Sequence, residues 1–209
     1  MHRQAIVALL ALASCLARPG RIWAQDLGLF GRVLSDAEAT AVKGGETYAS
    51  VSLGRGLATV TSIPRDSYGM DYSRASSFSV SVHNRVDYKT VNEKNYSYDT
   101  ARFPKGTASM AVSKIPDEYR QDRYGSSQGE WITTDAKRLV TAYPNRADET
   151  PVKSKPYMKE DNGYFWHANN AKPFEESKSF GCLISPQKDL DRIIRVIRND
   201  RGPKRIEVH

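Results

Sequence analysis

The chain has few cysteines and no long apolar run, and both shortages exclude whole classes of protein. Its 209 residues contain two cysteines, Cys15 and Cys182. Two thiols can build neither a disulfide framework nor a four-cysteine zinc site. No apolar run approaches the ~20 residues that a membrane-spanning helix needs, which excludes a polytopic membrane protein. The length suits one domain with a core of its own.

The chain also has no strong excess of charge. Lys and Arg total 31 against 24 Asp and Glu, a net charge of +7. Removal of residues 1–24 takes away three arginines and no acidic residue, which lowers the net charge to +4. A balance this small does not indicate nucleic acid as a partner.

The N-terminus reads as an export signal. Arg3 precedes an unbroken apolar stretch at 5–13, the order of a charged n-region and a short h-region. Cleavage after Ala24 would release a soluble protein. Residues 12–15, Leu-Ala-Ser-Cys, resemble a bacterial lipobox, in which the signal ends at residue 14 and Cys15 carries a lipid. Either cleavage site predicts a protein of the periplasm or cell envelope, or a secreted one.

The remaining chain predicts a mainly β (α+β) fold. Residues 25–46 read as a linker helix, with Ser35 as its cap and Gly44-Gly45 at its end. A single folded domain is expected over 47–209. Alternating patterns predict strands at 47–53, 56–62, 77–83 and 107–113.

The second half of the domain carries further signals. Residues 84–105 predict a long hairpin or an exposed loop, 130–143 another extended pair, and 144–161 a surface loop or lid. Ser185-Pro186 is a good start for a helix, in which Leu190, Ile193, Ile194 and Ile197 recur at helical spacing. Gly202-Pro203 ends that helix, and a strand at 205–208 closes the chain.

One segment combines residues that can do nucleophilic chemistry. His167 is followed, after a gap, by the run Ser179-Phe180-Gly181-Cys182. A histidine within hydrogen-bond reach can take the proton of a cysteine thiol and produce the reactive thiolate. Gly181 allows close backbone approach, so that N–H groups could form an oxyanion hole. Asn169 and Asn170, soon after the histidine, are candidate substrate contacts.

The order His, Ser-x-Gly-Cys and apolar residues resembles the L,D-transpeptidase catalytic domain of bacterial cell-wall enzymes. The resemblance covers about the last 45 residues well and implies an L,D-transpeptidase-like β-sandwich with a helix before the C-terminal strand. It implies Cys182 as nucleophile, His167 as general base, and Ser179 and Gly181 as pocket and oxyanion residues. The implied reaction cleaves peptidoglycan stem peptides after diaminopimelate through a Cys thioester. An amine then makes a 3–3 crosslink, or water hydrolyses the thioester. No metal or organic cofactor is implied.

The chain departs from that pattern at three positions. Ala168 stands where the family usually has Gly, Phe180 where it often has His, and Ile184 where it usually has Arg. The missing arginine would help to bind the acyl donor. Arg192 or Arg195, further along the helix, could take its place.

Two other interpretations stay open. A zinc site could use His83, Asp87, His167 and Cys182, although their spacing matches no established ligand motif. A secreted, non-catalytic cell-wall-binding module, or a pseudoenzyme of the same fold, could stack Tyr88, Tyr96 and Tyr98 on sugars or bases. The reactivity of the thiol distinguishes an active enzyme from a binding module. In an active enzyme, Cys182 should be alkylated fast near neutral pH, and more slowly in His167→Ala.

Overall fold

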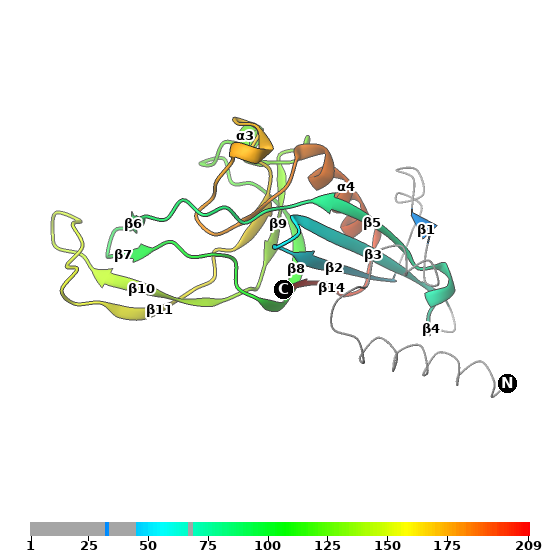
Figure 1. Cartoon of the computed structure of the whole chain (residues 1–209), viewed down its shortest axis with the longest axis horizontal. Helices are drawn as coiled ribbons and strands as arrows, with labels where there is room; N and C mark the ends of the chain where they lie inside the picture. Colours follow the sequence, from blue (N-terminus) through cyan, green and yellow to red (C-terminus); the bar gives the residue numbers. More distant parts are fainter. Residues whose placement is uncertain (1–31, 34–44, 67–68) are drawn as a thin grey trace.

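A computed structural model describes residues 32–33, 45–66 and 69–209, and Figure 1 shows its arrangement. The expected export signal, both of its cleavage sites and most of the expected linker helix lie outside the described residues. The described chain is mostly β, with two sheets and few helices, as the sequence predicts. Within this part of the chain, no helix is long and apolar enough to span a membrane.

The larger sheet has ten strands and places the last strand of the chain at its centre. Its order is β1-β5-β3-β2-β14-β8-β9-β12-β13, and β4 pairs with β3. In chain order the strands are β1 (Arg32–Val33), β2 (Gly45–Ser52), β3 (Leu57–Asp66), β4 (Gly69–Met70), β5 (Ser76–Ser81), β8 (Gly106–Lys114), β9 (Glu130–Thr134), β12 (Phe165–His167), β13 (Leu183–Ile184) and β14 (Lys204–Val208). β14 runs parallel to β2 and antiparallel to β8. The four strands predicted from alternating residues are confirmed as β2, β3, β5 and β8.

One face of this sheet forms the core. The cross-strand neighbours Ala49, Val60, Phe78 and Ile206 are all buried on it, because alternate strand residues point to the same side. The predicted C-terminal helix is confirmed as α4 (Gln187–Asn199), which buries Leu190, Ile193, Ile194, Val196 and Ile197. These residues belong to the same core cluster as the sheet face.

The smaller sheet extends away from the larger one at the left of Figure 1. Its order is β11-β10-β7-β6, with β6 (Thr90–Asn92), β7 (Tyr96–Asp99), β10 (Arg138–Pro144) and β11 (Tyr157–Asp161). The hairpin predicted within 84–105 is confirmed as β6 and β7. The segment 130–143 is extended as predicted, but β9 and β10 pair in different sheets and not with each other. The expected loop at 144–161 ends in a strand, because its last five residues pair with β10.

Two local expectations differ from the structure. Within the expected linker helix, Arg32–Val33 are extended, because their backbone pairs in parallel with β5. Ser185 does not cap α4, whose N-cap is Pro186 and has no side-chain cap. The Ser185 hydroxyl instead donates to the Ser81 carbonyl and accepts from the Trp166 indole. The other short helices are η2 (Tyr72–Arg74), α3 (Gln121–Tyr124) and η3 (Phe174–Glu176).

Candidate active site

The two predicted catalytic residues come from adjacent segments of the larger sheet, His167 at the end of β12 and Cys182 directly before β13. β12 and β13 pair in parallel, with Trp166 opposite Leu183 and His167 opposite Ile184. Trp166 and Leu183 are fully buried in the core face. Strand alternation therefore directs His167, and Cys182 just before β13, to the opposite face. The structure brings the predicted pair to adjacent strands and the same side of the sheet.

The Cys182 thiol lies against the backbone at the start of β12. It is partly exposed, accepts a hydrogen bond from the Phe165 N–H at 3.4 Å, and lies 3.8 Å from the Gly163 carbonyl oxygen. No hydrogen bond joins it to His167 among the described residues. Desolvation raises the pKa of Cys182 to about 12, and the negative charge of Asp161 adds to this rise.

His167 is buried and its ring orientation is fixed by one hydrogen bond. Its Nδ1 lies against the Ala168 carbonyl, and a carbonyl only accepts, so Nδ1 carries the proton. Nε2 then keeps a lone pair that can accept a proton. The Tyr124 ring stands edge-on to the imidazole, 5.6 Å between centroids. Desolvation lowers the pKa of His167 to about 4, so the resting pair is a neutral thiol and a neutral imidazole.

Ser179 and Gly181 form the turn that presents Cys182. The Ser179 hydroxyl donates to the Cys182 carbonyl at 2.8 Å and accepts from the Gly181 N–H at 3.2 Å. Ser179 therefore holds the turn, and the Gly181 N–H is paired within it. In the hydrogen bonds of the described residues, the Cys182 N–H has no acceptor, which leaves it available for an oxyanion.

Asn84 holds this turn from another part of the chain, and no sequence motif predicts this role. Its side-chain amide donates to the carbonyls of Gly181 at 2.6 Å and Cys182 at 2.9 Å. Its Oδ1 accepts from the Phe103 N–H at 2.9 Å. The residue follows the predicted strand at 77–83 directly, where a polar side chain carries no recognisable motif.

The two asparagines after His167 have different surroundings. Asn169 is buried, and its Oδ1 has no partner among the described residues. It lines a pocket of about 160 Å³ with Phe174, Ser177 and Ile184, as a substrate contact could. Asn170 instead donates to the carbonyls of Asp122 and Gly125, so it binds the segment around α3 and not an open site.

The arginines expected to replace the family residue lie elsewhere. The Arg192 guanidinium lies 4.1 Å from the Phe78 ring centroid, on the core side of the sheet. Arg195 lines a separate pocket with Asp191 and Arg198. Arg138, on β10, donates to the Arg102 carbonyl at 3.1 Å.

The zinc-site interpretation of the sequence includes His83 as a ligand. His83 Nε2 contacts the Phe174 carbonyl at 2.7 Å and the Ser177 hydroxyl at 3.1 Å, so its ring anchors the loop that contains η3. In the described ranges, no three His, Cys, Asp or Glu side chains are grouped as metal ligands would be.

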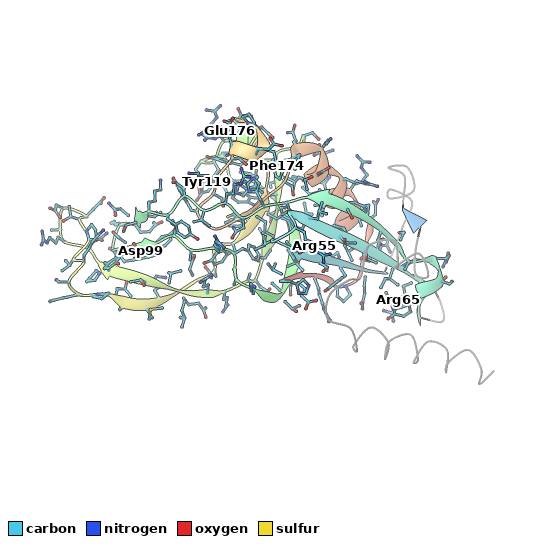
Figure 2. All side chains as sticks on the ribbon, in the orientation of Figure 1. Arg55, Arg65, Asp99, Tyr119, Phe174 and Glu176 are labelled. Carbon is cyan, nitrogen blue, oxygen red and sulfur yellow. The ribbon has the colours of Figure 1, made fainter. Side chains whose placement is uncertain are left out.

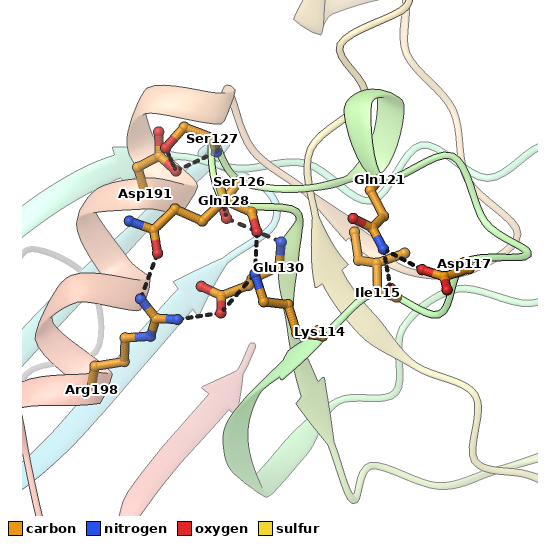
Figure 3. Close-up of polar contacts among 10 residues, drawn as sticks. All are labelled: Lys114, Ile115, Asp117, Gln121, Ser126, Ser127, Gln128, Glu130, Asp191 and Arg198. Carbon is orange, nitrogen blue, oxygen red and sulfur yellow. Dashed lines mark hydrogen bonds and ion pairs between the residues drawn. The ribbon is translucent and has the colours of Figure 1, made fainter.

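Two segments border the site: residues 115–130 and the loop that contains η3. Figure 2 labels a side chain from each, Tyr119 and Phe174. The first, residues 115–130, carries Tyr124 over His167. Figure 3 shows how it is held: buried Glu130 pairs with Arg198 of α4, and Asp191 accepts from the Ser127 N–H at 2.8 Å. Gln121 donates to the Ile115 carbonyl at 2.9 Å. Contacts with α4 therefore hold in place the 115–130 segment, whose Tyr124 packs against His167.

Comparisons with known proteins identify no family for this chain. No protein-family model matches the chain, and no curated protein matches it. A search of solved structures finds a match to the structure of Bdellovibrio bacteriovorus Bd1075, with a TM-score of 0.46 and 15% identity. The match covers 87% of this chain and 51% of the other, so the chain spans about half of that protein's length. At this TM-score the likeness assigns neither a fold family nor a function.

Proposed function

We propose that the protein is a cysteine acyl-transfer enzyme of the L,D-transpeptidase type, with an L,D-transpeptidase-like sandwich as its fold, acting on peptidoglycan stem peptides. One observation carries the proposal: Cys182 and His167 lie on one face of adjacent strands, and the tautomer of His167 leaves Nε2 able to accept a proton. The partly exposed thiol on a glycine turn gives a substrate carbonyl a place to approach.

The first half-reaction follows from these groups. The thiol proton passes to His167 Nε2, and the sulfur attacks the carbonyl carbon of diaminopimelate. The oxyanion accepts a hydrogen bond from the Cys182 N–H. The C–N bond then breaks, the departing amine takes the proton from the imidazolium, and a thioester remains on Cys182.

The second half-reaction releases the acyl group. An acceptor amine or water attacks the thioester carbonyl, His167 takes the attacking group's proton, and the sulfur leaves and is reprotonated. An amine gives a 3–3 crosslink and water gives a tripeptide. No metal or organic cofactor takes part in this scheme.

The resting separation of the pair is compatible with this chemistry. Catalytic hydrogen bonds are often long in the free enzyme and tighten only in the substrate complex. The thiol now faces the Phe165 N–H, and rotation about the Cα–Cβ bond of Cys182 turns the sulfur without moving the strand. We infer that substrate binding brings about this rotation.

The proposed place of action follows from the N-terminal signal, which predicts the periplasm, the cell envelope or secretion, with a lipid on Cys15 as the alternative anchor. No nucleic acid is expected as a partner.

Digestion of purified sacculi tests the proposal. The mature protein and Cys182→Ala are each incubated with sacculi from several species, and the muropeptides are analysed by mass. New 3–3 dimers, or tripeptides in place of tetrapeptides, are expected with the wild type alone. Identical profiles with both proteins would refute the enzymatic proposal, and retention of both on the sacculi would then favour the non-catalytic binding module.

A further inference from the structure

The peptide group between Gly181 and Cys182 links the turn to the proposed reaction. Its carbonyl belongs to Gly181 and its N–H to Cys182, and this N–H is the proposed oxyanion donor. The peptide bond is trans and planar, so its C=O and N–H point in opposite directions. A contact that holds the Gly181 carbonyl therefore also sets the direction of the Cys182 N–H.

Glycine at position 181 leaves this peptide group free to rotate. Gly181 has a φ of +141°, and without a side chain it can also reach ψ values that other residues avoid. The peptide plane can therefore turn over by about 180° at small local cost. In the turned-over state the carbonyl oxygen faces the oxyanion, and the two negative oxygens repel each other. A hydrogen bond that holds the carbonyl excludes that state.

Asn84 supplies this hydrogen bond. Its Nδ2 donates to the Gly181 carbonyl at 2.6 Å and to the Cys182 carbonyl at 2.9 Å. Its Oδ1 accepts from the Phe103 N–H at 2.9 Å, and this contact decides which end of the amide faces the turn. The Ser179 hydroxyl reaches the Cys182 carbonyl. Of the hydrogen bonds within the described residues, that from Asn84 alone reaches the Gly181 carbonyl.

Asn84 is itself fixed beside the strand that follows the nucleophile. His83 and Ile184 exchange two backbone hydrogen bonds, at 3.0 and 2.9 Å, one residue away from Asn84 in the sequence. Because both ends of its side-chain amide are also bonded, Asn84 holds one orientation toward the turn. A hydrogen bond on a carbonyl further polarises its peptide group, which makes the N–H of that group a stronger donor.

We propose that Asn84 is a positioning residue that aims the Cys182 N–H at the oxyanion of the acyl-transfer reaction. The inference rests on the proposed function, because it takes Cys182 as a nucleophile that attacks a carbonyl. Asn84 acts through the peptide group and not on the thiol. Its loss should slow the reactions of Cys182 that pass through an oxyanion and leave other reactions of the same thiol unchanged.

Two small reagents that react with the same thiol test this role. The ester p-nitrophenyl acetate acylates Cys182: the sulfur attacks the ester carbonyl, an oxyanion forms, and p-nitrophenolate leaves. Iodoacetamide alkylates the sulfur by displacement of iodide, without an oxyanion. Both reactions consume the thiolate, so the ratio of the two rate constants at pH 8 cancels the thiolate population and reports the oxyanion contact. Cys182→Ala supplies the background rate for each reagent.

We expect Asn84→Ala to lower the ratio of acylation to alkylation at least about tenfold, since loss of an oxyanion donor slows acyl transfer about 10²–10³-fold in enzymes. Asn84→Asp keeps the shape and the acceptor for the Phe103 N–H but has no N–H donor, and should lower the ratio by a similar factor. This variant carries the test if Asn84→Ala does not fold.

Asn145→Ala is the matched control. The Asn145 amide also donates to a backbone carbonyl, that of Glu93 at 2.6 Å, and accepts from the Ser97 hydroxyl at 2.7 Å. It lies directly after β10 of the smaller sheet, so its removal should leave the ratio at the wild-type value.

Cleavage of a muropeptide tetrapeptide, measured in parallel, separates this inference from the proposed function. An unchanged ratio in both Asn84 variants overturns the positioning role, and a wild type that cleaves the tetrapeptide then leaves the proposed function standing. A ratio that falls as expected, in a protein that leaves the tetrapeptide intact, supports the positioning role and refutes the stem-peptide substrate. Equal losses in both rates would show that Asn84 only supports the fold, which also overturns the inference.

Discussion

At the scale of single residues, Gly181 is the position in the Cys182 turn that least tolerates an added side chain. Its φ of +141° is in a region that favours glycine, and a Cβ there would lie 2.4 Å from the Ala101 carbonyl oxygen. We expect Gly181→Ala to lower the free energy of unfolding by about 2 kcal/mol or more.

Chemical denaturation measures that change, together with the activity on sacculi. Gly54→Ala is the matched control, since a Cβ at Gly54 meets nothing within 4 Å. Equal midpoints for the two variants would contradict the strained geometry of the turn.

The resting protonation state of Cys182 is also a residue-scale prediction. Because burial raises the pKa of its thiol to about 12, the thiolate fraction at neutral pH is small. The rate of alkylation by iodoacetamide in the free enzyme should therefore rise about tenfold per pH unit between pH 7 and 10. A small-molecule thiol measured in parallel should level off near pH 9. A plateau for Cys182 below pH 8 would contradict the neutral resting thiol.

This state differs from the fast alkylation that the motif alone predicts. The sequence identifies Cys182 and His167 because both residue types, their order and their flanking glycine follow a known pattern. The burial of His167 cannot be predicted from the same pattern, because Tyr124 packs against its ring from elsewhere in the chain. Asn84 escapes prediction for the same reason, since it reaches the Cys182 turn from a distant part of the chain.

At the scale of elements, the contact between α4 and the 115–130 segment depends on one buried carboxylate. Glu130 has a side chain 4% exposed, and it pairs with Arg198 and lies 3.8 Å from Lys114. We expect Arg198→Gln to lower the free energy of unfolding by about 1–3 kcal/mol, because it removes the main partner of a buried charge.

Thermal or chemical denaturation measures this loss against Arg120→Gln. Arg120 pairs with Asp122 at 2.8 Å, but both side chains are about 70% exposed, and such pairs contribute little. If the two variants lose the same stability, Glu130 does not depend on Arg198.

Element prediction from sequence succeeds where one periodic pattern runs over six or more residues. β2, β3, β5, β8 and α4 all have such a pattern, with one face buried in a common core. β1 and β13 have two residues each, too few for any periodicity to show. The assignment of β9 and β10 to different sheets depends on distant partners, which local sequence does not record.

For the whole molecule, buried neutral His167 predicts how stability depends on pH. Its folded pKa of about 4 lies below the ordinary value of 6.5, so between these values the unfolded chain binds a proton that the folded chain does not. The contribution of His167 is therefore complete above pH 6.5 and is lost as the pH falls toward 4, by about 3 kcal/mol.

Denaturation curves from pH 4 to 8 measure this slope. In His167→Gln the loss of stability between pH 6.5 and 4 should be smaller by that amount than in the wild type. His209→Gln, which removes an exposed histidine, is the control and should keep the wild-type slope. The same slope in all three proteins would show that His167 is not buried in its neutral form.

In the proposed reaction, Cys182 carries the acyl group of a stem peptide. The most direct test of this step is the intact mass of the protein after rapid mixing with a muropeptide tetrapeptide and acid quenching, followed by mapping of the modified peptide. We expect a hydroxylamine-sensitive adduct of the tripeptide acyl mass on the peptide that contains Cys182, and none in Cys182→Ala. An unmodified Cys182 beside intact tetrapeptide, at every time point, would contradict it.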